Sequence, residues 1–600
     1  MISSEHRVLF LPDKIEISVT DGTSIVHAFH KAGLPIDAPC GGNGTCGKCM
    51  VRVKMKNGSI ELKQACITPI TEDIIIDIAH LVSEHRILQD GSGNQVKLDP
   101  MIKRVPVCVE KAKLGDIRSE WERLAEATAL VSGLTAEDLS VHPAVVSSLY
   151  ENLINYSYKA DLFLCGSEVL SVSPQGSPFY AVAFDIGTTS IVGYLLDLES
   201  GNQLAVSSVL NPQSAYGADV VMRAKYSLEN GVSILTNAVR EALNSIIIDV
   251  AKQANIDSND IYLISVAGNT CMHHLFLGVS PASLVFAPYN PAIRNGLILR
   301  AADCSIEVNP HAKLIALPNI AGFVGADTVA AILASDMDKS EKMTLLIDIG
   351  TNGEIVLGNS NGMIACSTAA GPAFEGALIE CGMRGATGAI DHVSLSGGHV
   401  DYSVIGGKKP VGICGSGLID AIAQLVQVGL IDETGKLQNK DHTIEGADLS
   451  SRVRSMNGKN AFVLVEADKS GTGSPIYITQ KDIREVQLAK GAISAGIMLL
   501  AEQLGVSIDD VEQVFIAGAF GNYMSPESAC QISLIPSILK NKITPIGNAA
   551  GEGSKRIVLN EDEFQRTKHI SDTCGYLELA AHPEFQDTFI DCLSFSDMSK

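Results

Sequence analysis

The sequence predicts a multidomain protein in which a small N-terminal β-grasp domain and a small α/β middle domain precede a C-terminal α/β region of two related lobes. Three observations support this prediction. The chain has 600 residues, enough for several hydrophobic cores. Four cysteines stand close together near the N-terminus, and one strand–turn–strand pattern occurs twice farther along the chain.

The cysteines of the N-terminal part have the spacing of metal or cluster ligands. Cys40, Cys46, Cys49 and Cys66 are arranged as C-x5-C-x2-C-x16-C, and four glycines stand among the first three. Glycine lets a loop curl with its amide N–H groups inward, which suits an anionic iron–sulfur cluster. A structural zinc site usually pairs two C-x2-C units, and here there is one; four unrelated buried cysteines are the other alternative. We expect these four cysteines to bind a [2Fe–2S] cluster.

The residues around the cysteines have the order of a β-grasp ferredoxin. Alternating apolar residues predict a hairpin over 8–19, and a 3.6-residue apolar period predicts a helix that begins near Ile25. A strand is predicted at 50–53, and Cys66 comes just before an apolar run at 74–78. Residues 1–86 therefore resemble a plant-type or adrenodoxin-type ferredoxin domain. The cysteine loop has one residue more than the plant-type spacing, which favours the adrenodoxin type.

The following stretch carries no recognisable chemistry. Residues 87–100 lose apolar periodicity and predict a linker. Residues 101–175 predict a middle domain, with a helix over 120–130 and a capping box formed by Thr135 and Asp138. We interpret this domain as a spacer or a docking module.

Composition excludes several classes of protein. The net charge of −23 argues against nucleic acid or an anionic membrane as the main partner. No apolar run approaches the roughly 18 residues of a membrane span, and the first residues lead into strand-like sequence, not into an apolar signal core. Fourteen cysteines without dense disulfide spacing fit a reducing cytoplasm. We expect a cytoplasmic protein, and the cluster suggests anaerobic use.

The repeated pattern is a buried strand followed by an acidic residue, a glycine turn and hydroxyl residues. It occurs after the strands predicted at 180–184 and 343–347. Such a turn brings backbone N–H groups and Thr hydroxyls onto phosphate oxygens, while the Asp holds Mg²⁺ directly or through water. The candidate phosphate and Mg²⁺ ligands are Asp185, Gly187, Thr188 and Thr189 in the first copy, and Asp348, Gly350, Thr351, Asn352, Gly353 and Glu354 in the second.

A third glycine turn follows the strand predicted at 514–517, where Gly518 and Phe520 are candidates for contact with an adenosine. Two phosphate loops and a late adenosine turn resemble the actin, sugar-kinase and heat-shock-chaperone ATPase superfamily. The resemblance implies two lobes, here 176–340 and 341–600, that hinge around ATP. The ATP prediction rests on this superfamily alone, because the sequence contains no P-loop motif G-x4-G-K-[ST].

That superfamily also carries an acidic residue on the helix before the second phosphate loop. Asp327 fills this place and is our candidate for positioning the attacking water; Asp219 is the candidate counterpart in the first lobe. For both residues the alternative is an Asp that caps a helix N-terminus.

A ferredoxin domain joined to this ATPase core resembles the reductive activators of corrinoid proteins. The resemblance extends over the whole chain and is carried by the blocks 211–213 with 216–220, 268–274, 371–376, 412–420 and 479–485. Gly415 and Gly417 in the fourth block are further candidate cofactor-binding residues. His273 and His274 invite a metal-ligand interpretation, although helix packing is simpler. The remaining cysteines are most simply small buried hydrophobes.

The resemblance implies an ATP-hydrolysing enzyme that passes an electron from its [2Fe–2S] cluster to the Co(II) form of a corrinoid protein and returns it to Co(I). Its cofactors would be the cluster, ATP and Mg²⁺. Its partners would be the corrinoid protein of a methyltransferase system and an upstream electron donor, and a homodimer is compatible with the sequence.

Three alternatives stay open at this point. One is an ATP-driven electron donor to another low-potential enzyme, although activators of radical dehydratases usually hold a [4Fe–4S] cluster at a dimer interface. The second is a metabolite kinase with a fused ferredoxin domain. The third is a chaperone-like ATPase that clamps a corrinoid protein without reducing it.

Overall fold

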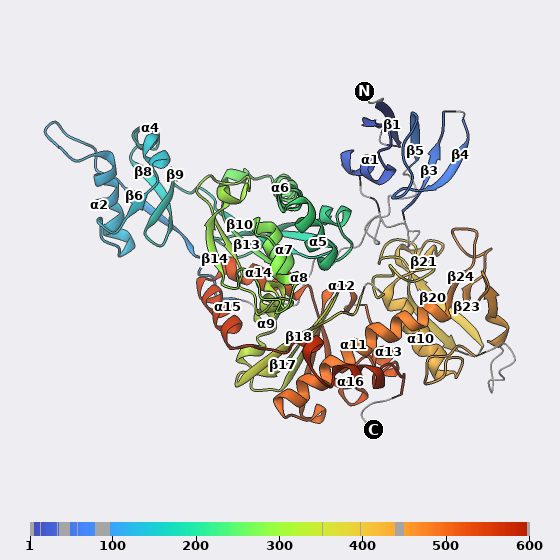
Figure 1. The fold of residues 1–600 in the computed structure, drawn as a ribbon. Coiled ribbons are helices and arrows are strands. Elements are labelled where there is room, and N and C mark those ends of the chain that lie inside the picture. The colour runs from blue at the N-terminus through green and yellow to red at the C-terminus, as the bar shows by residue number, and fades with distance from the viewer. Residues whose placement is uncertain are drawn as a thin grey trace.

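The computed structural model describes residues 5–12, 14–32, 34, 36, 49–56, 58–77, 96–350, 352–371, 373–396, 398–438, 449–521 and 523–596. Figure 1 shows two small domains at separate places on the periphery and two larger lobes between them. The N-terminal sheet lies beyond the second lobe, and the sheet of the middle domain projects from the first.

The N-terminal domain is a five-stranded β-grasp sheet with the order β2-β1-β5-β3-β4. The predicted hairpin is confirmed, because β1 and β2 pair antiparallel, while β1 and β5 pair parallel. One helix packs on the sheet, and the rings of Phe10 and Phe29 meet edge to face with centroids 4.9 Å apart. The elements are β1 (Glu5–Leu11), β2 (Ile15–Thr20), α1 (Ile25–Lys31), β3 (Met50–Lys54), β4 (Ile60–Gln64) and β5 (Ile74–Asp77).

The middle domain is a four-stranded sheet with the order β6-β8-β9-β7, covered by helices. The predicted helix at 120–130 is confirmed, but the capping box of Thr135 and Asp138 closes only a turn, since the chain passes directly into β7. The next helix begins at Pro143. The elements are β6 (Ile102–Cys108), α2 (Glu120–Ser132), β7 (Ser140–Val141), α3 (Pro143–Ser147), α4 (Leu149–Asn155), β8 (Lys159–Cys165) and β9 (Glu168–Pro174).

The first lobe has a six-stranded sheet with the order β12-β11-β10-β13-β15-β14. Its strands are β10 (Tyr180–Ile186), β11 (Ser190–Asp197), β12 (Gln203–Leu210), β13 (Ile261–Gly268), β14 (Leu297–Arg300) and β15 (Lys313–Ala316). Its helices are α5 (Val220–Asn230), α6 (Ser233–Ala254), α7 (Thr270–Leu277), α8 (Ala282–Val285) and α9 (Ala326–Ser335).

The second lobe has a six-stranded sheet with the order β26-β25-β16-β17-β18-β27 and two three-stranded sheets, β20-β19-β21 and β22-β23-β24. The main sheet contains β16 (Thr344–Ile349), β17 (Gly353–Asn359), β18 (Gly362–Thr368), β25 (Gln513–Ala517), β26 (Ile543–Gly547) and β27 (Gly575–Tyr576). The small sheets contain β19 (Ala389–Ser396), β20 (His399–Val404), β21 (Gly412–Ile413), β22 (Val453–Met456), β23 (Lys459–Val465) and β24 (Ile476–Thr479).

The helices of this C-terminal part are α10 (Gly415–Gln427), α11 (Gln480–Leu504), α12 (Gly518–Gly521), α13 (Pro526–Gln531), α14 (Ala549–Leu559), α15 (Glu561–Thr573) and α16 (Phe585–Asp591). No helix among the described residues has both the length and the apolar character that a membrane crossing requires.

The two main sheets have the same topology. The order β12-β11-β10-β13-β15 of the first lobe repeats as β18-β17-β16-β25-β26 in the second. In each lobe the first strand pairs antiparallel with the second and parallel with the fourth. The repeated sequence pattern therefore reflects a duplicated fold, and its two copies occupy equivalent strands.

The lobes interlock through α9 and α14, which pack together in a hydrophobic cluster shared by both sheets. A Cβ added to Gly553 of α14 would lie 2.0 Å from the carbonyl oxygen of Ala330 in α9, so glycine is required for this approach. Although it follows β26 of the second lobe, α14 also packs on the first, where the Ser554 hydroxyl donates to the carbonyl of Phe184 at 3.1 Å.

The end of the predicted linker is held on the two lobes. Residues 78–95 lie outside the described residues, but the N–H of Asp99 donates to the carbonyl of Leu559 at 2.8 Å, and the N–H of Glu561 donates to the carbonyl of Asp99 at 2.9 Å. The Asn560 side chain donates to the carbonyl of Lys97 at 2.8 Å. The chain therefore enters the middle domain from the junction of α14 and α15.

Candidate nucleotide and cluster sites

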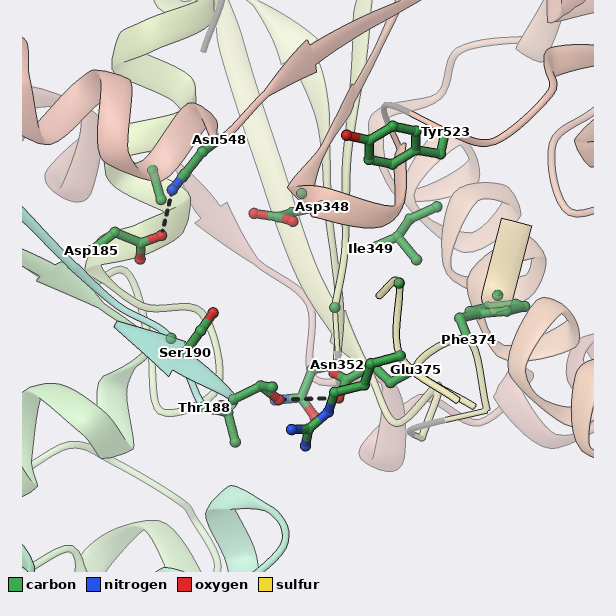
Figure 2. A pocket seen from close by; sticks show the side chains of 18 of the residues that line it. Asp185, Thr188, Ser190, Asp348, Ile349, Asn352, Phe374, Glu375, Tyr523 and Asn548 are labelled. Atoms are coloured by element: carbon green, nitrogen blue, oxygen red, sulfur yellow. Dashed lines mark hydrogen bonds between the residues drawn. The ribbon is translucent and has the colours of Figure 1, made fainter. Parts of the chain in front are cut away.

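A cavity of about 300 Å³ lies between the two lobes and brings together most of the predicted nucleotide ligands. Figure 2 shows that Asp185 and Asp348 approach it from opposite sides and point toward one another. The predicted residues that line the cavity are Asp185, Gly187, Thr188, Thr189, Asp327, Asp348, Gly350, Asn352, Glu354, Gly415 and Gly518.

Strand geometry explains why the two phosphate-loop aspartates meet. Asp185 is the penultimate residue of β10 and Asp348 is the penultimate residue of β16. Each strand has a parallel partner in its own sheet, with Asp185 opposite Ala267 and Asp348 opposite Ala517. The carboxyl ends of the central strands of both sheets therefore open into the same cleft, as is usual for ligand sites of α/β proteins.

Burial makes these acids unusually weak. Desolvation, together with a smaller contribution from the nearby Asp327 carboxylate, raises the pKa of both Asp185 and Asp348 to about 7. Burial also raises the pKa of Asp327 to about 6 and that of Glu354 well above its usual range. Buried carboxyls that crowd together favour either protonation or a bound cation.

The carboxylates do not form a ready-made metal cage. Over the part of the chain that the structure describes, no three His, Cys, Asp or Glu side chains converge closely enough to hold a metal ion. Mg²⁺ in nucleotide sites usually keeps several waters and binds one or two carboxylates together with phosphate oxygens. The acids present therefore fit Mg²⁺ that arrives with a nucleotide and is held largely through water.

The first phosphate loop is held by side chains from three elements. Asn269, the N-cap of α7, donates to the Thr188 hydroxyl at 3.0 Å. The buried guanidinium of Arg223 in α5 donates to the Thr188 carbonyl at 2.6 Å. Arg223 forms no salt bridge among the described contacts, and desolvation lowers its pKa to about 10. Because this pKa is still above neutral pH, Arg223 braces the loop as a cation. The Thr189 hydroxyl donates to Glu375 of the second lobe at 3.0 Å.

The turn after β25, the predicted adenosine turn, has a glycine where a side chain would not fit. Gly518 has φ +87°, and a Cβ there would lie 2.7 Å from Oδ1 of Asp348 and 2.9 Å from the carbonyl oxygen of Ile349. Glycine is therefore required here for contact with the chain itself, and the predicted contact of Gly518 with an adenosine stays a prediction. The side chain of Phe520 and the whole of Thr351 lie outside the described residues.

Two predicted glycines do not line the cavity. A Cβ on Gly417 would lie 2.4 Å from the carbonyl oxygen of Ile390, so this glycine allows α10 to pack on β19. A Cβ on Gly353 would lie 2.7 Å from the Thr368 hydroxyl, so this glycine allows β17 to approach β18. Both glycines therefore serve packing beside the site.

The cavity contains residues that the sequence prediction missed. Asn548, the N-cap of α14, donates to Asp185 at 2.9 Å and to the Tyr194 hydroxyl at 3.1 Å. Asn269, Phe374, Glu375, Cys414 and Ser416 belong to the blocks that carried the resemblance, and that membership was the available signal. Other lining residues without an earlier assignment include Ser190, Arg384, Asp391 and Tyr523.

Three polar residues with an alternative interpretation turn out to be structural. Asp219 does not line the cavity; it caps α5 by accepting from the N–H of Met222 at 2.8 Å. His273 and His274 are buried in α7. Nδ1 of His274 lies 2.7 Å from the Thr270 carbonyl, and its Nε2 accepts from the N–H of Ala292 at 3.0 Å. Burial lowers the pKa of His273 to about 3, which agrees with a packed neutral pair.

Half of the predicted cluster site lies within the described residues. Cys49 is buried at the start of β3 and Cys66 is partly buried after β4, while Cys40 and Cys46 lie outside. The N–H of Ala65 donates to the carbonyl of Cys49 at 2.8 Å, so both described cysteines stand at one end of the β3–β4 hairpin. This placement fits two ligands of one cluster.

One of the other cysteines contradicts the prediction of buried hydrophobes. Cys108 is exposed, because it ends β6 on the solvent side, and Cys165 and Cys381 are only partly buried. The prediction holds for the buried Cys271, Cys304, Cys366, Cys414 and Cys530.

Comparison with known proteins finds three family regions in order along the chain. Residues 9–71 match the 2Fe-2S iron-sulfur cluster binding domain. Residues 180–340, which form the first lobe described above, match the RACo middle region. Residues 342–600 match the C-terminal domain of RACo, an ASKHA (actin-like ATPase) domain. The predicted fold class is thereby confirmed.

Similar proteins share a named activity. The corrinoid activation enzyme RamQ of Eubacterium limosum is 36% identical, over 98% of this chain and 99% of its own. The [Co(II) methylated amine-specific corrinoid protein] reductase of Methanosarcina barkeri is 26% identical, over 69% of this chain and 77% of its own. The solved structure of a reductive activator for corrinoid, iron-sulfur protein matches with a TM-score of 0.76 and 33% identity, and covers 98% of both chains.

The match to RamQ spans nearly the full length of both proteins, and the cleft and cysteines described above lie within the matched regions. The chain therefore belongs to the family of reductive activators of corrinoid proteins.

Proposed function

We propose that this protein uses ATP to drive the reductive activation of a corrinoid protein in a methyltransferase system. The chain passes one electron to inactive Co(II) on its partner, which returns to Co(I), and an upstream donor restores the electron. The observation that carries the proposal is the presence, on one chain of this family, of a ferredoxin-like domain and an interlobe cleft with two phosphate loops.

The residues divide the work between two sites. Cys40, Cys46, Cys49 and Cys66 would hold the [2Fe–2S] cluster, which when bound supplies a one-electron donor. In the cleft, Asp185 and Asp348 would hold Mg²⁺, the turns at 187–189 and 350–352 would bind the phosphates, and Gly518 and Phe520 would contact the adenosine.

ATP is needed because the electron transfer is uphill. Plant-type clusters lie near −400 mV, the corrinoid couple is expected to be lower, and each ~100 mV of uphill one-electron transfer costs roughly 2.3 kcal/mol. Closure of the lobes around ATP offsets this cost if the closed state binds a partner conformation in which cobalt is easier to reduce. ATP then acts on conformation, and no phosphoryl group passes to a substrate.

The test combines a spectrum with a reduction assay. Protein purified without oxygen should contain two irons per chain and show visible absorbance, and with a strong reductant and ATP it should convert Co(II) of a candidate corrinoid protein to Co(I). Cys49→Ser should lose the absorbance and the reduction but keep ATP hydrolysis. Cys108→Ser, a change of the exposed cysteine on β6, is the matched control and should behave like the wild type.

Bound zinc without visible absorbance would exclude the cluster. Reduction at the same rate without ATP would exclude the coupling, and phosphorylation of a metabolite without any electron donor would favour a kinase.

A further inference from the structure

The hydrogen bond between Thr189 and Glu375 spans the cleft at the point where phosphates are expected. Thr189 belongs to the first phosphate loop, and its hydroxyl donates to Oε2 of Glu375 at 3.0 Å. Figure 2 places Glu375 beside Asn352 of the second phosphate loop, across from Thr188. A side-chain carboxylate of the second lobe therefore lies between the two loops that would bind a polyphosphate.

A phosphate and this carboxylate are competitors. The hydroxyl proton of Thr189 can be donated to one strong acceptor at a time, and two anions at hydrogen-bond range of the same donor repel one another. The cavity is already rich in acids, since six carboxyl side chains and one arginine line it: Asp185, Asp327, Asp348, Glu354, Glu375, Asp391 and Arg384. A nucleotide that enters must therefore bring a cation and also displace Glu375 from Thr189.

The segment that carries Glu375 is fixed on one side of it and connected to the small sheet on the other. Phe374 is only 3% exposed in the core of the second lobe. A Cβ on Gly376 would lie 2.7 Å from the backbone of Met383, and the N–H of Met383 donates to the carbonyl of Ile413 in β21 at 2.9 Å. A shift of Glu375 therefore reaches β21 and the start of α10 through tight backbone contacts.

We propose that Glu375 is a latch that joins the lobes in the nucleotide-free protein and is displaced by the phosphates of ATP. This inference rests on the proposed ATP-dependent function and adds the residue that senses the nucleotide. Release of the latch frees the first phosphate loop to hold ATP and moves the segment 375–383 against the β20-β19-β21 sheet. In Figure 1 this sheet is the part of the second lobe toward the ferredoxin-like domain. Movement of the sheet on ATP binding is therefore transmitted toward the domain that would hold the cluster.

Three variants of one chain test the latch by affinity for the Mg²⁺ complex of a non-hydrolysable ATP analogue, measured by calorimetry. Glu375→Gln keeps an acceptor for Thr189 but removes the charge, so the affinity should rise about tenfold. Glu375→Asp keeps the charge but shortens the side chain, so the affinity should not rise comparably. Glu527→Gln, which removes an exposed acid that pairs with Lys540 outside the cavity and outside the segment 375–383, should leave affinity and ATP hydrolysis unchanged.

Unchanged or weaker binding by Glu375→Gln would overturn the latch while leaving the ATPase function intact. Wild-type protein that binds no nucleotide would instead overturn the proposed function. A second measurement needs no variant: in a crystal structure of the wild-type complex with the analogue, Thr189 Oγ1 and Glu375 Oε2 should be separated beyond hydrogen-bond distance. Retention of their 3.0 Å contact beside bound phosphates would also overturn the latch.

Discussion

The buried carboxyls of the cleft tie the stability of the nucleotide-free protein to pH. The folded-state pKa values of Asp185 and Asp348 are raised from 3.8 to about 7. Between those values the folded protein binds more protons than the unfolded chain, so stability falls as pH rises from about 4 to about 7. Above pH 7 the full cost of the buried charges remains until a cation enters with the nucleotide.

Asp348→Asn is expected to remove the free-energy cost of burying one carboxylate and, separately, to lower catalysis. The variant should lower ATP turnover at least about 100-fold, because the proposed ligand of the Mg²⁺ complex is lost. It should also stabilise the nucleotide-free protein by on the order of 1–3 kcal/mol at pH 8 and by less at pH 5. Thermal unfolding at both pH values, together with the cluster spectrum, checks this. A stability change that is independent of pH would contradict the buried-charge account.

Asp327→Asn tests a different role. Asp327 lies in the first turn of α9, lines the cavity, and has a pKa raised to about 6 by burial. If it positions the attacking water, the variant should bind ATP normally but lose about 10²–10⁴-fold in turnover. It should fail at repeated rounds of Co(II) reduction while still accepting an electron at the cluster. Repeated reduction without hydrolysis would leave a plain reductase with an ATP-sensing domain.

At the scale of elements, the contact of α9 with α14 decides how the lobes can move. The N-cap of α14 is Asn548, which contacts Asp185, and its C-cap is Asn560, which holds the end of the linker. It lies against α9 so closely that a Cβ on Gly553 would overlap the backbone of Ala330. Any movement of one lobe relative to the other must therefore change the packing of α9 on α14.

Gly553→Ala should disturb this contact. One added methyl group forces the helices apart, which should destabilise the protein by about 1–3 kcal/mol and lower ATP turnover. Gly362→Ala is the control, because a Cβ at this first residue of β18 meets nothing within 4 Å. Chemical denaturation and ATPase rates of both variants provide the measurement. Wild-type stability in Gly553→Ala would mean that the helix contact is looser than described.

At the scale of the whole molecule, the ferredoxin-like domain has a core of its own. Over the described part of the chain, the cluster of buried side chains around Phe10 and Phe29 draws only on residues of the N-terminal domain. The two lobes, by contrast, share one hydrophobic cluster that also includes Met101 and Phe163 of the middle domain. The N-terminal domain is therefore a separate folding unit, whereas the rest of the chain folds together.

A chain shortened to residues 96–600 should consequently hydrolyse ATP with wild-type KM and kcat. It retains the contacts of Lys97 and Asp99 with the α14–α15 junction. It should contain no iron and should not reduce Co(II), even with a strong reductant. Aggregation of the shortened chain, or loss of ATP hydrolysis, would show that the N-terminal domain supports the fold of the lobes.

The sequence by itself determined the features that depend on local pattern. Cysteine spacing indicated the cluster site, and two strand–Asp–Gly–Thr units indicated the phosphate loops. Such features can be predicted because residues close together in the sequence determine a turn and the strands beside it. One local pattern gave a wrong prediction. Thr135 and Asp138 form the hydrogen bonds of a capping box, but they do so in a turn and not at a helix N-terminus, because β7 begins before a helix can extend.

Only the tertiary structure decided which side chains complete the site. Thr189 and Glu375 are 186 residues apart, and Asp185 and Asn548 are 363 apart. Their contacts arise because the sheets of the two lobes face one cleft and because α14 of the second lobe packs on the first. The raised pKa values follow from the same enclosure. Burial and long-range contacts depend on how the lobes pack, and the spacing of residues along the sequence does not predict them.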